Sequence, residues 1–300
     1  MSAEHIPVLA EPVSEIITLA PDAVVVDATL GHGGHSEIFA RALGPSGTLI
    51  GLDVDKSSIA SAKQHLASAD LKCKMLFYQA NFAEIADALA IAGFKAVDLI
   101  FADLGFCSAQ MADPDRGLSF QTDGRLDMRL DDRLRRTAAD IVNSVDEKGL
   151  ADLIYEFGQE RASRKIARSI VHHRSNRKIT TTGQLSTIIC QAMKVNPLSR
   201  KKKTHPATKT FQALRIAVNG ELECLKTLLS ESPKLLTTGG KIGIISFHSL
   251  EDRIVKFDFR ENASAGTYEI LTKRPVTADS NEIEINPRSR SAKLRFAQKI

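Results

Sequence analysis

The stretch VVVDATLGHGGHS at residues 24–36 decides the fold. Its three valines predict a buried parallel strand, because such strands are apolar on both faces. The glycines that follow allow a tight turn and let the backbone approach a ligand closely, and a helix is expected over residues 35–43. A second apolar run over residues 48–52 ends at Asp53, about twenty residues after the glycines, where a ribose-binding acid is expected. The stretch therefore predicts a βαβ unit that binds a nucleotide-like ligand.

Carboxylates follow three of the expected strands. Asp27 ends the first, Asp53 ends the second and Asp103 ends a later one, VDLIFAD at residues 97–103. Ligands of open α/β sheets bind at the carboxyl ends of the strands. Gathered acids would repel a pyrophosphate but suit a ligand with positive charge and a ribose. They favour S-adenosylmethionine and disfavour a dinucleotide-dependent oxidoreductase.

Strand and helix alternate up to residue 103, as in a doubly wound parallel sheet, and the alternation then stops. Residues 5–13 are expected to form an arm that caps the sheet, and residues 109–136 are expected to be irregular and polar. The other expected strands are residues 73–78, 241–247, 268–273 and 293–298. The other expected helices are residues 57–67, 81–92, 137–142, 147–157, 160–174, 182–193 and 210–230. Ser57 is expected to cap the first of these helices and Thr182 the helix over 182–193. The simplest organisation is a sheet domain of residues 1–108 and 209–300 with a mainly helical insert of residues 109–208.

The composition is that of a soluble globular protein. Of 300 residues, 43% are hydrophobic and 25% charged, and no apolar run is long enough to cross a membrane. The first residues lack the features of a signal peptide, so a cytoplasmic protein without a membrane partner is expected. The four cysteines form no CxxC pair, which argues against a metal site or a disulfide framework.

Positive charge is concentrated in the middle of the chain. Residues 133–215 hold 18 Lys and Arg against 6 Asp and Glu, although the whole chain has a net charge of only +4. Such an excess favours a polyanionic partner, and a nucleic acid is the natural one. The candidate RNA-binding residues are those spaced along one helix face and those of the basic loop after it: Arg161, Arg164, Lys165, Arg168, Lys201, Lys202, Lys203, His205 and Lys209.

With these features in place, almost the whole chain resembles one family, the bacterial S-adenosylmethionine-dependent methyltransferases that act on cytosine N4 of 16S ribosomal RNA. The resemblance implies an α/β, Rossmann-like class I methyltransferase sheet with an inserted helical domain, and a substrate within the small ribosomal subunit. The motifs that carry it are HIPVL (5–9), TLGHGGHS (29–36), DLG (103–105), RGLSF (116–120), LDMR (126–129), HPATKTFQA (205–213), ISFHSLEDR (245–253) and NPRSRS (286–291).

The resemblance also implies a set of cofactor contacts. Asp53 is expected to hold the ribose and Phe82 to stack on the adenine, although Phe82 is equally suited to start a helix and His35 to cap one. Carried over residue by residue, the contacts are Gly33, Gly34, His35, Asp53, Phe82, Asp103 and Gln110.

Three positions depart from the family pattern. Residues Phe106-Cys107-Ser108 stand where Val-Ser-Ser is usual, which affects the expected shape of the target-base pocket. Arg125 replaces a common proline, and the segment between Arg260 and Asn286 is short; both concern surface loops.

An exocyclic amine is a weak nucleophile, and an enzyme helps by accepting its hydrogen bonds and aligning it with the methyl donor. Asp103 and Ser108 lie where such acceptors are needed, and which atom takes the proton stays open.

Cys107 suggests a second hypothesis for the function, a cytosine C5 methyltransferase in which this cysteine is the nucleophile. A third is a non-catalytic RNA-binding assembly factor. His248 is better suited to a structural hydrogen bond than to the role of a base.

Overall fold

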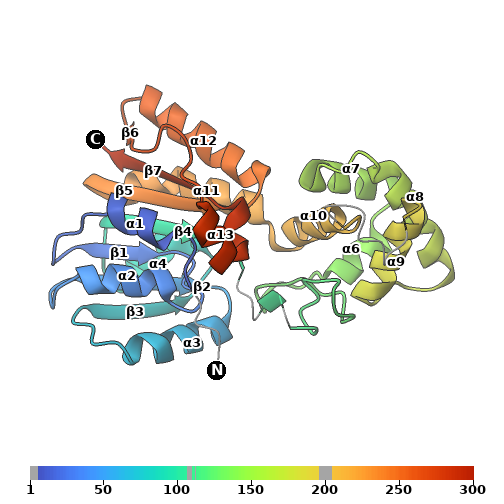
Figure 1. Cartoon of the computed structure of the whole chain (residues 1–300), viewed down its shortest axis with the longest axis horizontal. Coiled ribbons are helices and arrows are strands. Elements are labelled where there is room, and N and C mark those ends of the chain that lie inside the picture. Colours follow the sequence, from blue (N-terminus) through green and yellow to red (C-terminus); the bar gives the residue numbers. More distant parts are fainter. Residues whose placement is uncertain (1–5, 107–109, 112, 196–204) are drawn as a thin grey trace. The chain divides into compact units, whose positions relative to one another are not determined.

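The computed structural model describes residues 6–106, 110–111, 113–195 and 205–300. The chain divides into two compact units, one of residues 1–105 and 222–300 and the other of residues 106–221 (Figure 1). Each unit is described by itself.

The first unit is built on a seven-stranded sheet of order β3-β2-β1-β4-β5-β7-β6. The strands from β3 to β5 are parallel, and β7 runs antiparallel to both β5 and β6. The expected α/β sheet is confirmed. The strands are β1 (Val24–Asp27), β2 (Thr48–Asp53), β3 (Lys74–Gln79), β4 (Val97–Asp103), β5 (Leu236–Ser246), β6 (Tyr268–Ile270) and β7 (Lys293–Lys299).

Helices cover both faces of this sheet, because alternate strand residues point to opposite sides. Val26, Ile50 and Ile100 pack on one face with side chains of α4 (Ile85–Ala92), α11 (Glu221–Leu235) and α12 (Ser249–Ser264). Val25, Leu49 and Leu99 pack on the other with α1 (Ala10–Ile16), α2 (Gly34–Ala42) and α3 (Lys56–Ala67). The central strands are apolar throughout because both faces are buried.

The second unit is helical and has its own core. Its helices are α6 (Ala138–Ser144), α7 (Glu147–Gly158), α8 (Ser163–Asn176), α9 (Thr182–Ala192) and α10 (Thr208–Asn219). Ile141, Ile154, Ile166, Ile189 and Phe211, one from each helix, belong to a single buried cluster. In the described part of residues 109–136, the segment from 113 on contains turns and one β-bridge, from Arg125 to Thr181, without helix or strand.

The expected helix over residues 210–230 is wrong as one element. Gly220 has φ +61° and ends α10, and α11 begins at Glu221. Because Phe211 and Leu214 are buried in the helical core, α10 belongs to the second unit. The second unit therefore extends to residue 221, and the expected domain boundary at residue 208 lies too early.

Other local expectations also need correction. The arm expected over residues 5–13 contains α1 from Ala10 onward. Asp55, not Ser57, caps α3, and Thr181, not Thr182, caps α9. Strand β6 ends at Ile270, three residues earlier than expected. Helix α12, α13 (Ser280–Ile285) and the 3₁₀ helix η2 (Pro287–Ser291) were not expected from the sequence.

Candidate active site

The glycine turn joins β1 to α2 and is fixed by backbone hydrogen bonds. The N–H of Leu30 donates to the Leu52 carbonyl over 2.8 Å, and the N–H of Gly33 donates to the Leu30 carbonyl over 2.8 Å. Gly33 caps α2 with φ +87°, a left-handed conformation that glycine adopts without strain. Gly33 therefore forms the tight turn expected between strand and helix, and the helix begins at Gly34 rather than at His35.

Asp53 lies at the end of β2 and supports the glycine turn. Its Oδ2 accepts from the N–H of Gly31 over 2.8 Å, and its Oδ1 accepts from the N–H of Asp55 over 2.8 Å. Burial raises the pKa of Asp53 to about 6 against the lowering effect of these two hydrogen bonds. A carboxylate oxygen can accept two hydrogen bonds, so Asp53 keeps capacity for ribose hydroxyls.

Asp27 is oriented differently from the sequence expectation of a ligand-facing carboxylate. It is only 1% exposed, and its Oδ2 accepts from the Ser36 hydroxyl over 2.6 Å. The N–H of Thr29 donates to its Oδ1 over 3.2 Å. Burial raises the pKa of Asp27 to about 6. Asp27 therefore fastens the start of α2 to the end of β1, a role that the sequence did not reveal.

Asp103 ends β4 next to the glycine turn. Its backbone N–H donates to the Thr29 hydroxyl over 2.6 Å. Burial, reinforced by the Asp27 carboxylate, raises the pKa of Asp103 to about 7, although the Gly105 backbone and Arg288 act in the opposite direction. Among the described residues, its buried Oδ1 has no hydrogen-bond partner. A buried acceptor without a partner is costly, so this oxygen is available for a ligand hydrogen.

His35 lies in the first turn of α2 and is 7% exposed. Its Nε2 is 2.9 Å from the Val8 carbonyl oxygen, and its Nδ1 is 3.8 Å from Oδ2 of Asp103. The imidazole also packs against the Phe101 ring, with ring centroids 4.8 Å apart. His35 is thus a buried neighbour of Asp103 and does not act as the helix cap.

The remaining expected contacts are distributed over both units. Phe82 begins the 3₁₀ helix η1 (Phe82–Glu84) behind Asn81, whose side chain and Glu84 form a reciprocal cap. Phe82 is half-buried and packs on the core of the first unit. Gln110 lies in the second unit. Cys107 and Ser108 fall outside the described residues.

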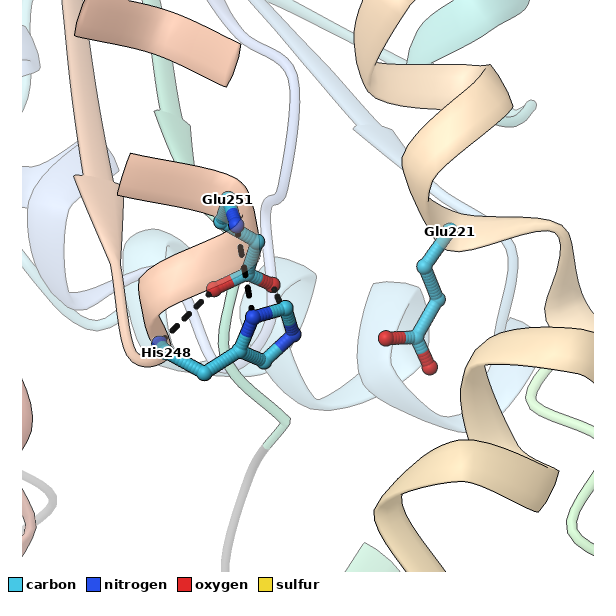
Figure 2. A group of neighbouring side chains, drawn as sticks. All are labelled: Glu221, His248 and Glu251. Atoms are coloured by element: carbon cyan, nitrogen blue, oxygen red, sulfur yellow. Dashed lines mark hydrogen bonds and ion pairs between the residues drawn. The ribbon is translucent and has the colours of Figure 1, made fainter. Parts of the chain in front are cut away.

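His248 is held by Glu251 at the start of α12. The Glu251 N–H donates to the His248 Nδ1 over 3.3 Å, and the Glu251 carboxylate accepts from the backbone N–H of His248 over 3.1 Å (Figure 2). The backbone N–H of Phe247 donates to the same carboxylate over 2.8 Å. These reciprocal bonds form a capping box, and they explain why the ISFHSLEDR motif has a histidine and a glutamate at the turn between β5 and α12. They agree with a structural role for His248.

The basic residues expected to bind RNA lie in the second unit. Four of them belong to α8 or to the turn before it, and all four are exposed: Arg161, Arg164, Lys165 and Arg168. Arg168 is 3.4 Å from an exposed carboxylate, Glu147, a pair of little energetic weight. Lys209 donates to the Gln159 carbonyl over 2.9 Å. Lys201, Lys202 and Lys203 lie outside the described residues.

His205 differs from the rest of this basic set. Its ring stacks on Phe120 with centroids 4.5 Å apart, and its Nδ1 accepts from the Ala207 N–H over 3.2 Å. Burial lowers the pKa of His205, which favours the neutral imidazole. His205 therefore packs within the second unit and shapes the start of α10.

The buried Asp27 predicts a measurable dependence of stability on pH. Its folded pKa of about 6 lies above the usual aspartate value of 3.8, so the folded state holds the proton more tightly. Stability should then fall as the pH rises from 4 to 6, by about 3 kcal/mol for this group at 1.36 kcal/mol per pKa unit. Asp27→Asn should flatten that fall in urea unfolding, whereas exposed Asp22→Asn should not. Equal pH dependence in both variants would contradict the assignment.

The sheet order, the single antiparallel strand β7 and the glycine turn followed by Asp53 are those of a class I methyltransferase. The chain belongs to the MraW methylase family, whose model matches residues 2–300. The expected class, an S-adenosylmethionine-dependent methyltransferase, is confirmed by this membership.

Two relatives show the extent of the similarity. A ribosomal RNA small subunit methyltransferase H of Acidobacterium capsulatum is 46% identical over 300 residues, which cover 98% of each chain. A protein of the same name from Koribacter versatilis is 47% identical over 299 residues, covering 98% of this chain and 93% of the relative. A solved structure described as a putative rRNA-methylase from Clostridium thermocellum aligns over 97% of this chain and 95% of its own, with a TM-score of 0.47 and 14% identity.

Within the described residues, no helix combines the length and the apolar character that a membrane span requires.

Proposed function

We propose that this protein transfers a methyl group from S-adenosylmethionine to the N4 amine of a cytidine in the decoding region of 16S ribosomal RNA. The observation that carries the proposal is the buried Oδ1 of Asp103, an acceptor without a partner among the described residues, at the strand end beside the glycine turn. The names of the two relatives support a small-subunit RNA substrate. The ribosome also makes the cytoplasm the expected place of action.

The residues at the strand ends fit the proposed cofactor. Asp53 offers a carboxylate at hydrogen-bond distance from the glycine turn, where ribose hydroxyls are expected. Half-buried Phe82 offers part of an aromatic ring for the adenine, and the carboxylates suit a positively charged ligand. When bound, S-adenosylmethionine supplies an electrophilic methyl group on a sulfonium.

The chain itself has to hold the amine and receive its proton. The N4 lone pair is delocalised into the cytosine ring, so an acceptor that holds the amine hydrogens favours the nucleophilic form. Asp103 provides such an acceptor, and burial raises its pKa to about 7, near neutral pH. The target base must leave any stack to present N4 to a buried methyl donor.

The test is mass spectrometry of small-subunit RNA nucleosides from cells with and without this protein. We expect N4-methylated cytidine to depend on its presence. 5-Methylcytosine, or a stable adduct between Cys107 and a 5-fluorocytosine substrate, would instead support the C5 mechanism. If cells without the protein keep all their methylated nucleosides, and calorimetry detects no binding of S-adenosylmethionine, the protein would instead be a non-catalytic assembly factor.

We further propose that the second unit recognises RNA through the exposed basic face of α8 and through Lys201, Lys202 and Lys203. Replacing Arg164, Lys165 and Arg168 with glutamine should weaken RNA binding and flatten its dependence on salt. On single strands, the log–log slope should change by about 0.7 for each phosphate that the variant no longer neutralises.

The matched control removes three exposed lysines of the first unit, Lys95, Lys226 and Lys234, by the same change to glutamine. We expect its salt dependence, measured by fluorescence anisotropy, to stay close to that of the unmodified protein. Equal slopes in both triple variants would mean that α8 is only a solvated face. A variant in which Lys201, Lys202 and Lys203 are replaced with alanine tests these three lysines in the same way.

A further inference from the structure

The NPRSRS motif forms the 3₁₀ helix η2 directly before β7, and strand pairing fixes its place in the fold. Strand β7 runs antiparallel to β5, and its first residue, Lys293, pairs with Ser246 at the carboxyl end of β5. Strand β4 ends beside this point, because Asp103 pairs with Ile245. The residues just before Lys293 therefore lie at the edge of the sheet where ligands of α/β proteins bind.

Helix η2 is also anchored close to the glycine turn. The amide of Asn286, which precedes η2, donates to the Ile6 carbonyl over 3.1 Å. The residue after Ile6 is Pro7, and a Cβ added to Gly34 would be 3.2 Å from the Cβ of this proline. Ser289 in the middle of η2 is buried, and its hydroxyl donates to the Asn286 carbonyl over 2.8 Å. The motif is therefore held near the start of α2, with the N-terminal segment between them.

Arg288 of η2 is half-buried, and its charge acts on both the glycine turn and β4. Burial lowers the pKa of His32 in the glycine turn, and the Arg288 guanidinium lowers it further. Burial raises the pKa of Asp103 to about 7, reinforced by the Asp27 carboxylate, and Arg288 acts against this rise. Because Coulomb interactions weaken with distance, the guanidinium lies near both groups. Arg288 therefore brings a positive charge to an edge that is otherwise rich in carboxylates.

S-adenosylmethionine carries charges of both signs. Its sulfonium and its ammonium suit the carboxylates at the strand ends, but ionised Asp53 and Asp103 repel its own carboxylate. A cation at the same edge removes this conflict. A guanidinium is a planar fork that binds a carboxylate through two parallel hydrogen bonds, and its remaining N–H groups can keep other contacts at the same time. Arg288 therefore has the chemistry that the carboxylate of this ligand requires.

We propose that Arg288 is a cofactor-binding residue whose guanidinium pairs with the carboxylate in the methionine part of S-adenosylmethionine. The proposal rests on the cofactor, which membership of the family establishes, and not on which atom of the RNA is methylated. It gives the NPRSRS motif a function besides starting β7. An RNA phosphate is the other anion available to this arginine, and the nearby glycine turn, where the backbone can approach the cofactor, favours the carboxylate.

Calorimetric titration with two ligands tests the pairing without any reaction. Decarboxylated S-adenosylmethionine lacks the carboxylate but keeps the sulfonium, the amine and the adenosine. The unmodified protein should bind S-adenosylmethionine about tenfold or more tighter than the decarboxylated compound, the preference expected from a charge-assisted hydrogen bond. Arg288→Gln should bring the two affinities close together, mainly by weakening the binding of S-adenosylmethionine.

Arg290→Gln is the matched control, because it removes the same charge from an exposed arginine of the same helix. It should keep the preference of the unmodified protein. Arg288→Lys keeps the charge but lacks the planar fork, so it should retain only part of the preference. Because the two ligands are compared on one protein at a time, a general loss of stability cancels in the ratio of their affinities.

Two results of the titrations would overturn the proposal: no preference in the unmodified protein, or an undiminished preference in Arg288→Gln. Equal weakening of both ligands by Arg288→Gln would do so too, because it would indicate a general disturbance of the site. Unchanged binding of both ligands with weaker RNA binding in fluorescence anisotropy would instead assign Arg288 to an RNA phosphate.

These outcomes are separate from those of the nucleoside analysis. If Arg288→Gln loses the preference but an atom other than cytidine N4 is methylated, the proposed function fails and the role of Arg288 stands. If N4 is methylated and Arg288→Gln keeps the full preference, this proposal alone fails.

Discussion

Asp103→Asn should reduce the rate of methyl transfer by about two orders of magnitude or more, the usual effect of removing a positioned proton acceptor. The asparagine keeps the size of the side chain and one acceptor oxygen, but it cannot take up the amine proton. The backbone bond from residue 103 to the Thr29 hydroxyl is unaffected by this change. Single-turnover assays at saturating cofactor measure the effect without contributions from product release.

Asp98→Asn is the matched control for this prediction. Asp98 lies on the same strand at its opposite end, where it accepts from the Val24 N–H over 2.8 Å and from the Thr237 hydroxyl over 2.9 Å. It should lose stability but little activity per folded molecule. Cys107→Ala should likewise keep much of the activity. An active Asp103→Asn protein, or an inactive Cys107→Ala protein, would contradict the proposed mechanism.

Asp53→Ala should weaken cofactor binding at least tenfold, because each charge-assisted hydrogen bond contributes about 1.5–3 kcal/mol. The structure adds a second cause, since the variant also leaves the N–H groups of Gly31 and Asp55 without their acceptor. Asp53→Asn separates the two causes, because it removes the charge but retains one acceptor oxygen. Calorimetric titration with S-adenosylmethionine measures both variants.

The pKa of Asp53 gives this prediction a dependence on pH. Because that pKa is raised to about 6, the free protein holds a proton there in mildly acidic solution. Cofactor affinity should therefore fall as the pH drops below 6 in the unmodified protein and stay flatter in Asp53→Asn. Exposed Asp87→Asn on α4 is the control and should match the unmodified protein. Unchanged affinity in a folded Asp53→Ala protein would remove Asp53 from the site.

The sequence by itself determined the sheet and its glycine turn. The runs at 24–27 and 97–103 could be read as strands because burial on both faces leaves little room for polar residues. The spacing from the glycines to Asp53 and the acid at 103 then placed two carboxylates at one edge. These signals are local, since a strand, a turn and the acid after it are consecutive in the chain.

The tertiary structure decided what each acid faces. Asp27 ends a strand just as Asp53 and Asp103 do, yet its buried carboxylate accepts a hydrogen bond from the Ser36 hydroxyl. Asp103, in contrast, keeps a buried oxygen without a partner among the described residues.

The sequence does not predict the break at Gly220, because the apolar pattern continues through it. Burial of Phe211 with side chains of α7 and α8 assigns α10 to the helical unit. The His35 Nε2 lies 2.9 Å from the carbonyl of Val8, 27 residues earlier in the chain, and the backbone N–H of Leu9 donates to Glu282, 273 residues later. Periodicity carries no information about contacts between such distant segments, because they form only when the whole sheet has brought the two ends of the chain together.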